Sequence, residues 1–185
     1  MSTNVDPRIR RTRDALGDAL VALMQERPFD SLTVQDVLDR AGVGRSTFYV
    51  HYRGKDDLFS SDVDEFWSAM ANAKVQPPRI APLRELLEHT AGMAPFIDAL
   101  RSAGKHHEVF ELGQLHFARA IGRRLARADR AAHLTKARRD ALAFAQAGAM
   151  LALLDWWLTH GQPMPPADAD ELFHRAFWSG VESLR

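Results

Sequence analysis

Seven residues between Val43 and Phe59 have side chains that could take part in chemistry. They are Arg45, Ser46, Thr47, Tyr49, His51, Tyr52 and Lys55. A serine, a tyrosine, a histidine and a lysine could form a hydrolytic or proton-transfer site. The same hydrogen-bond donors could instead bind the phosphates of a nucleic acid. The two alternatives require different arrangements of the helices that carry these residues.

A catalytic site is the weaker alternative. Ser46 and Tyr49 share one face of a short helix, but His51 falls on another side. No acidic residue is placed to orient His51, and no oxyanion loop is evident. The sequence has no cysteine, which removes a thiol nucleophile, disulfides and thiolate metal sites together. We therefore predict that the chain is not an enzyme and needs no cofactor.

The residues His106, His107, Glu111 and His116 are the one group in the sequence that invites a metal-site interpretation. His107 and Glu111 are one helical turn apart, but the spacing of the group is not a recognised zinc pattern. We expect these residues to be ordinary surface or pocket side chains, and no metal is predicted.

The elements that would position these side chains are predicted to be helices throughout. Nearly every long segment has helical periodicity, and no alternating strand pattern is convincing. The predicted helices span about 7–26, 34–41, 45–52, 55–74, 83–90, 94–103, 107–128, 135–160 and 167–184. In the first of these, the inner stripe is expected to carry Ile9, Leu16, Ala19, Leu20 and Leu23.

The two short helices before residue 55 have the pattern of a helix-turn-helix. Thr33 is a suitable N-cap, with Asp36 three positions later. Gly42 can adopt the left-handed conformation that ends a helix. Val43 and Phe48 are the expected core anchors of the helix that follows. Two short helices joined by a glycine-containing turn are typical of this motif.

The segment from Leu32 to Phe59, LTVQDVLDRAGVGRSTFYVHYRGKDDLF, resembles the DNA-binding domain of the TetR (tetracycline repressor) family. The positions that agree with the family's pattern are Thr33, Ala41, Gly42, Val43, Thr47, Phe48, Tyr49, Tyr52, Lys55 and Leu58. Val37–Leu38 replaces the more usual Ile-Ala, and Gly44 stands where serine is common. The resemblance implies an all-α fold in which a three-helix helix-turn-helix domain is joined by a long helix to a helical ligand-binding and dimerisation domain.

We expect the first domain to span residues 1–55, with a linking helix at about 55–74. The sequence VQPPRIAP breaks that helix, so the regulatory and dimerisation domain is expected at 75–185. The resemblance implies that the recognition helix at 45–52 enters a major groove. Arg45 is the candidate base reader, because a guanidinium can bridge guanine O6 and N7. The predicted DNA-binding residues are Thr33, Arg45, Ser46, Thr47, Tyr49, His51, Tyr52 and Lys55.

Lys55 is predicted to contact phosphate for a separate reason. It opens a helix, where the dipole disfavours a cation, and an adjacent phosphate would compensate. The overall charge does not decide the partner, because 24 basic residues balance 24 acidic ones. Arg8, Arg10, Arg11 and Arg13 could flank DNA or be solvated. For the basic run at 119–139, a solvated helix end is favoured over a secondary anion site.

Beyond the first domain, the predictions concern an effector pocket and a dimer interface. Candidate pocket residues are Phe96, Leu100, Phe110, His116, Phe117, Gln146, Met150, Trp156, Trp157 and Phe177, although a plain core role explains most of these aromatics. The predicted dimer interface is a four-helix arrangement through Ala145, Gly148, Ala152, Phe173, Phe177, Trp178 and Val181. Apolar faces that serve only the monomer core are the alternative.

These patterns together favour a homodimeric, cytoplasmic transcriptional regulator, most simply a repressor. Its partners would be double-stranded DNA with a palindromic operator, a second copy of itself and a small-molecule effector. No membrane association is expected, since the apolar segment 141–158 is interrupted by Gln146, Gly148 and Asp155. The alternative is a DNA-binding adaptor whose C-terminal domain recruits a protein and binds no ligand.

Overall fold

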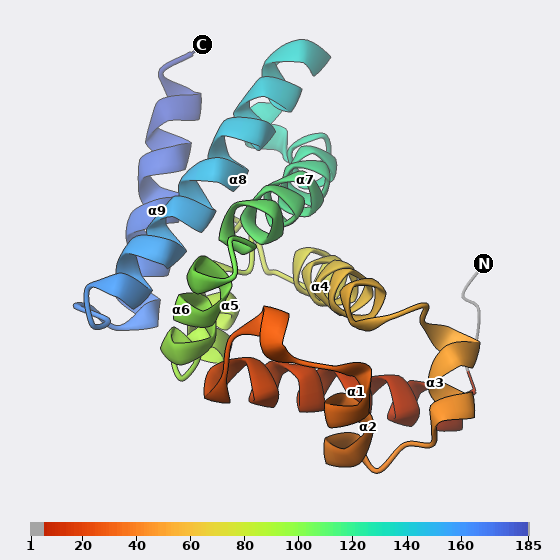
Figure 1. Ribbon diagram of the computed structural model, residues 1–185. Helices are drawn as coiled ribbons and strands as arrows, with labels where there is room; N and C mark the ends of the chain where they lie inside the picture. Colours follow the sequence, from red (N-terminus) through yellow and green to blue (C-terminus); the bar gives the residue numbers. More distant parts are fainter. Residues whose placement is uncertain (1–5, 185) are drawn as a thin grey trace. The chain divides into compact units, whose positions relative to one another are not determined.

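The computed structural model describes residues 6–184, and every regular element in that part of the chain is helical (Figure 1). The elements are α1 (Pro7–Glu26), η1 (Phe29–Ser31), α2 (Val34–Ala41), α3 (Arg45–His51), α4 (Lys55–Asn72), α5 (Leu83–Thr90), α6 (Ala94–Ser102), α7 (His106–Leu125), η2 (Asp129–Ala131), α8 (Lys136–Thr159) and α9 (Pro166–Glu182). The all-α prediction is confirmed, and the predicted helix limits differ from these by at most a few residues.

The chain divides into two compact units. The N-terminal unit comprises residues 1–65 and 95–106, and the C-terminal unit comprises 66–94 and 107–185. The dividing point after Glu65 lies inside α4, whereas the break VQPPRIAP lies within the C-terminal unit. The functional domain limits of 1–55 and 75–185 therefore stay predictions.

The core of the N-terminal unit forms where the inner stripe of α1 meets α2. Leu16, Leu20 and Leu23 are buried, and so is Phe48 from α3. Ile9 was expected on the same stripe, but it is 39% exposed because it lies at the start of α1, beyond most of the buried residues. Burial of each large aliphatic or aromatic side chain contributes about 1.5–3 kcal/mol, so this small unit has a substantial core.

The C-terminal unit packs α5 against α9 and buries one side of α8. Phe117 and Trp157 are among its fully buried side chains. The indole Nε1 of Trp178 donates a hydrogen bond to the carbonyl of Pro78, which fastens α9 to the segment before α5. Asp170, also on α9, accepts from the backbone N–H of Arg84 and pairs with Arg79.

Helix α8 is long and apolar enough to cross a membrane by length and composition alone, but much of its apolar surface is used within the fold. Its buried residues are Ala143, Ala147, Met150, Leu151, Leu154, Trp157 and Leu158. In its most apolar window, 39% of the residues are buried. The opposite side of α8 remains exposed and is apolar as well, which a core role in the single chain does not explain.

Candidate DNA-binding site

A capping box and a left-handed glycine define the helix-turn-helix. The Thr33 hydroxyl accepts from the backbone N–H of Asp36 at 3.2 Å, and the Asp36 carboxylate accepts from the N–H of Thr33 at 2.8 Å. Gly42 ends α2 with φ +65°, a conformation that costs other residues about 1–2 kcal/mol. Both features agree with the sequence prediction. They set where α2 begins and where the chain turns toward α3.

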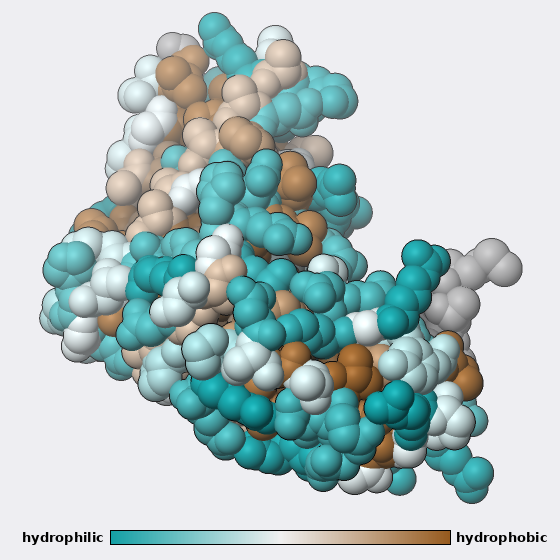
Figure 2. Space-filling view, viewed as in Figure 1, coloured by the Kyte–Doolittle hydropathy of each residue, from teal (hydrophilic) through white to brown (hydrophobic). Residues whose placement is uncertain are grey.

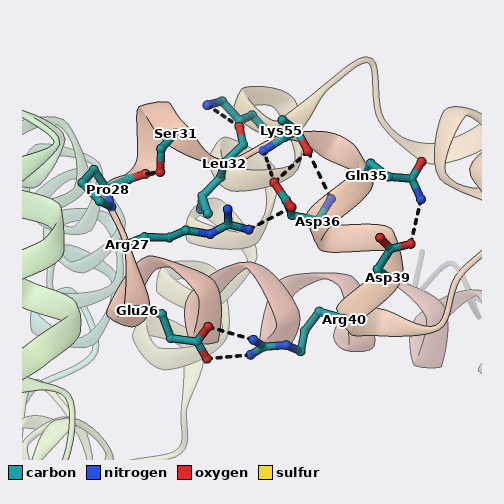
Figure 3. A network of polar contacts seen from close by, with 11 residues as sticks. Glu26, Arg27, Pro28, Ser31, Leu32, Gln35, Asp36, Asp39, Arg40 and Lys55 are labelled. Atoms are coloured by element: carbon teal, nitrogen blue, oxygen red, sulfur yellow. Dashed lines mark hydrogen bonds and ion pairs between the residues drawn. The ribbon is translucent and has the colours of Figure 1, made fainter.

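Two ion pairs then fix α2 against the end of α1 (Figure 3). The guanidinium of Arg40 donates to both carboxylate oxygens of Glu26, at 2.9 and 2.8 Å. Arg27 reaches Asp36 at 2.9 Å. Hydrogen bonds from Thr33 and Arg27 lower the pKa of Asp36 to about 2, so this carboxylate stays ionised and keeps both partners.

Helix α3 is anchored from one side and open on the other. Phe48 is fully buried and holds the helix to the unit, while Val43 is only half-buried. The exposed residues of α3 are Arg45, Ser46, Thr47, Tyr49 and Val50. The predicted contact residues at 45–49 therefore share an accessible helix surface. An exposed helix of this size can enter the major groove of B-DNA.

Val50 is a candidate contact that the sequence analysis missed. It is 77% exposed, a high value for an aliphatic side chain on a helix. A methyl-bearing side chain in the major groove can contact the methyl group of thymine. The signal was present in the sequence, because an apolar residue lay on the outward face of a helix whose core anchor was already identified.

Gln35 is a second missed residue. Its side-chain carbonyl accepts a hydrogen bond from Arg45 Nη2 at 3.1 Å, and its amide donates to Asp39 (Figure 3). Gln35 on α2 therefore holds the candidate base reader on α3 in one direction. Nothing in the spacing of the two residues reveals this pair before the helices are folded together.

Tyr52 is placed differently from its expected role at the DNA. It is only 5% exposed, and its hydroxyl accepts from Arg13 Nε at 3.0 Å. Arg13 also donates to Ser61 and pairs with Glu65, so it joins α1 to α4 as well. The hydrogen bond with Tyr52 raises the pKa of Arg13. These contacts make the pair a structural tie; a DNA contact by Tyr52 stays a prediction.

Lys55, at the start of α4, is stabilised by backbone carbonyls of the same chain. Its Nζ donates to the carbonyl of Leu32 at 2.9 Å (Figure 3). It also donates to the carbonyl of Phe29 at 2.8 Å, with a longer contact to that of Asp30. The ammonium also lies 4.5 Å from the centroid of the Phe29 ring. These acceptors offset the unfavourable helix dipole without any phosphate. Phosphate contact by Lys55 stays a prediction, but its original reason no longer holds.

The side chains considered for catalysis are not connected. In the part of the chain described, no hydrogen bond links Ser46, Tyr49 and His51 to one another. His51 is half-buried and lies beside the ring of Tyr52, with 6.2 Å between the ring centroids. Within the same described part, no group of three or more His, Asp or Glu side chains could hold a metal ion.

The predicted pocket residues have several different surroundings. Phe96 and Leu100 belong to the N-terminal unit, whereas the remaining predicted pocket residues belong to the C-terminal unit. There, Phe117, Met150 and Trp157 are core residues with 0–1% exposure. Gln146 and Phe177 line an open groove of about 600 Å³ between α8 and α9. His116 is half-buried and Trp156 is exposed. An effector pocket built from this set stays a prediction.

The predicted interface residues divide into two groups. Ala145 and Ala152 are exposed on α8, and Gly148 is half-buried against Gln114. On α9, the chain itself already buries Phe173, Phe177, Trp178 and Val181. These four side chains therefore have little surface to offer a second subunit. The large exposed apolar side chains on the same two helices are Phe144, Trp156 and Leu172, and Leu184 just after the end of α9 is exposed as well.

The sequence has relatives among bacterial regulators. Residues 16–61 match the family described as bacterial regulatory proteins, tetR family. Two Bacillus subtilis proteins named as uncharacterized HTH-type transcriptional regulators are similar. YxbF is 33% identical over 58 residues, which cover 31% of this chain and 15% of YxbF. YdeS is 27% identical over 109 residues, covering 59% of this chain and 53% of YdeS. The matches thus span at most about half of these relatives.

Solved structures share the fold over almost the whole chain. The dihydroxyacetone kinase operon activator DhaS superposes with a TM-score of 0.73 at 15% identity, covering 93% of this chain and 97% of DhaS. A TetR transcriptional regulator from Streptococcus agalactiae gives 0.54 at 23% identity, covering 93% and 96%. NalD from Pseudomonas aeruginosa, a secondary repressor of a multidrug efflux pump, gives 0.55 at 17%, covering 93% and 97%.

The family match includes the turn and the whole of α3, and it contains the capping box, Gly42 and buried Phe48 of the structure. The solved structures extend the agreement in fold to 93% of the chain. Residues 16–61 therefore match the N-terminal domain of the tetR family of bacterial regulatory proteins, and the chain as a whole has a TetR-like fold.

Proposed function

We propose that this protein is a homodimeric, cytoplasmic transcriptional regulator that binds a palindromic operator through α3. The observation that carries the proposal is the combination of a buried anchor and an open polar face on one short helix. Phe48 fixes α3, while Arg45, Ser46, Thr47 and Tyr49 remain accessible. Arginine and hydroxyl side chains on such a surface suit base edges and phosphate oxygens.

The proposed dimer uses the exposed sides of α8 and α9. Phe144 on α8 is 52% exposed and Leu172 on α9 is 57% exposed, and the small residues Ala145 and Ala152 are exposed on α8. Figure 2 shows brown and tan surface over these helices, between stretches of teal. A second copy would cover this apolar surface. A dimer would also present two recognition helices to half-sites about 34 Å apart.

A small-molecule effector is supported by one buried donor in the C-terminal unit. Trp67 on α4 is 3% exposed, and its ring meets the edges of Phe110 and Phe117. Its indole Nε1 has no hydrogen-bond acceptor among the residues that the structure describes. A buried donor without a partner costs about 1–3 kcal/mol, and an acceptor on a bound ligand would remove that cost.

We propose repression, with effector binding favouring a conformation of lower DNA affinity. The fold itself is compatible with either sign, because DhaS is an activator and NalD is a repressor. The adaptor function remains the second candidate, because Phe117, Met150 and Trp157 are packed as core. If the protein is an adaptor, its C-terminal unit should bind a protein partner, and no metabolite should raise its melting temperature.

Selection of genomic fragments on the purified protein tests DNA binding directly. We expect enrichment of a palindrome, with affinity for it that exceeds affinity for random duplex at every salt concentration. The affinity should fall as salt rises, because phosphate contacts release counterions. Equal binding to palindrome and random DNA would contradict sequence-specific regulation. A reporter placed behind the selected operator then gives the sign of regulation.

A further inference from the structure

The basic run at 119–139 contributes to a cleft that the proposed DNA and dimer surfaces do not use. The cleft has a volume of about 680 Å³ and lies between the segment after α4, the end of α7 and η2. Its charged lining residues are Lys74, Arg79, Arg123, Arg124, Arg127, Asp129 and Arg130. None of the predicted effector-pocket residues is among its lining residues. We propose that this cleft binds a multiply charged organic anion carrying phosphate or carboxylate groups.

Three of the cleft's six cations are committed to internal partners. Arg79 pairs with Asp170 and Glu85. Arg130 pairs with Glu182 and lies over the Trp178 ring, 4.6 Å from its centroid. Arg124 donates to three carbonyls, those of Ala71, Ala73 and Ile80, and burial lowers its pKa. These contacts hold the walls of the cleft in place.

The other three cations have no acidic partner in the described part of the chain. Arg123 donates only to the side-chain carbonyl of Asn72, at 2.7 Å. Lys74 and Arg127 are exposed, and no ion pair involves either side chain within residues 6–184. Asp129 is the single carboxylate among the lining residues. The cleft therefore carries an excess of positive charge.

The negative ends of the two helix dipoles at the cleft do not cancel its excess of positive charge. α4 and α7 both end at the cleft, and each C-terminus carries roughly half a negative charge. Together with Asp129 this amounts to about two negative charges. They face four positive ones, from Lys74, Arg123, Arg124 and Arg127, once the internally paired Arg79 and Arg130 are set aside. About two positive charges remain, which matches a dianionic ligand.

The shape and lining of the cleft favour a small organic molecule. Its volume lies within the range of about 300–1,000 Å³ that is typical of small-molecule sites. Val75, Pro77 and Pro78 provide apolar wall beside the cations. Inorganic phosphate would fill only a fraction of this space. A duplex backbone would need a projecting basic surface instead of a hollow.

Isothermal titration of the full chain tests the site, with the dianions glucose 6-phosphate and succinate as probes and glucose as the neutral control. We expect one site per chain for at least one anion, with binding that weakens as salt is added and is absent for glucose. The double variant Lys74→Ala/Arg127→Ala should weaken binding at least about tenfold. Its thermal stability should be unchanged, because neither side chain has a partner among the residues that the structure describes.

The matched control is Arg119→Ala/Arg138→Ala, which removes the same charge from exposed positions outside this cleft. It should bind the anion like the parent. Equal loss in both double variants would show general charge attraction and overturn the site, as would no heat with either anion. Weakened binding of random duplex by the cleft variant, without loss of anion binding, would assign the cleft to DNA instead. The anion titrations contain no operator DNA. Their outcome therefore does not depend on whether the protein regulates transcription as proposed.

Discussion

Asp62 on α4 provides a test of how the N-terminal unit depends on pH. Its carboxylate lies against Gly17 of α1, where an added Cβ would be 2.3 Å from Oδ1. Burial disfavours the charged form, and the nearby carboxylates of Asp18, Glu65 and Asp14 add to this effect, while Arg13 opposes it. Together they raise the pKa of Asp62 from 3.8 to about 6.

The direction in which stability changes with pH follows from the pH at which Asp62 loses its proton in the folded and in the unfolded chain. The unfolded chain releases it near pH 3.8, and the folded chain holds it until about pH 6. Between these values the folded state binds more protons, so the free energy of unfolding falls as pH rises. A shift of about two pKa units corresponds to about 3 kcal/mol. Because Asp62 is only half-buried, solvent screening reduces the expected effect to about 1–3 kcal/mol.

The variant Asp62→Asn removes this titration while keeping a similar shape. Urea unfolding from pH 4 to pH 7.5 should show the variant gaining about 1–3 kcal/mol over the parent across that interval. Ser60→Asn, which places the same new side chain at an exposed position of the same helix, is the control and should show no such trend. If the free energy of unfolding differs between Asp62→Asn and the parent by the same amount at every pH, the explanation by burial of the Asp62 carboxylate is refuted.

Three further outcomes are expected. Arg45→Ala should weaken operator binding by about 1–3 kcal/mol, measured by fluorescence anisotropy, with unchanged thermal stability; equal affinity would remove Arg45 as base reader. Lys55→Met should lower the free energy of unfolding by about 1–3 kcal/mol, because the carbonyls of Phe29 and Leu32 lose their donor. If the variant loses DNA affinity and keeps its stability, Lys55 acts only as a phosphate contact. Phe144→Glu/Leu172→Glu should produce monomers in sedimentation velocity while leaving the fold intact, since both side chains are exposed; a persistent dimer would place the interface elsewhere.

The helices could be predicted closely because their signals are local. Thr33 with Asp36 forms a capping box within four residues, and Gly42 closes the same helix through its own backbone conformation. The apolar periodicity then identified Phe48 as the anchor, and the residues on the remaining face as the candidate contacts. Each of these inferences uses neighbours within about two helical turns, where spacing in sequence determines position in space.

Partners that are distant in sequence could not be predicted in the same way. Gln35 reaches Arg45 only after α2 and α3 are packed together. On α9, an apolar stripe can face its own chain or a second subunit, and periodicity does not distinguish the two. Burial in the folded chain assigns Phe173, Phe177, Trp178 and Val181 to the monomer core, and Leu172 remains exposed.

The sequence alone therefore determined the helical elements, the helix-turn-helix and the TetR-like character of the N-terminal segment, because these rest on local conformation and a dense motif. The tertiary structure decided which polar groups are free to bind DNA. Lys55 and Tyr52 matched the motif, yet the fold supplies carbonyls of η1 to the lysine and Arg13 of α1 to the tyrosine. Buried polar groups take the partners that folding brings to them, and those partners lie 26 and 39 residues away along the chain.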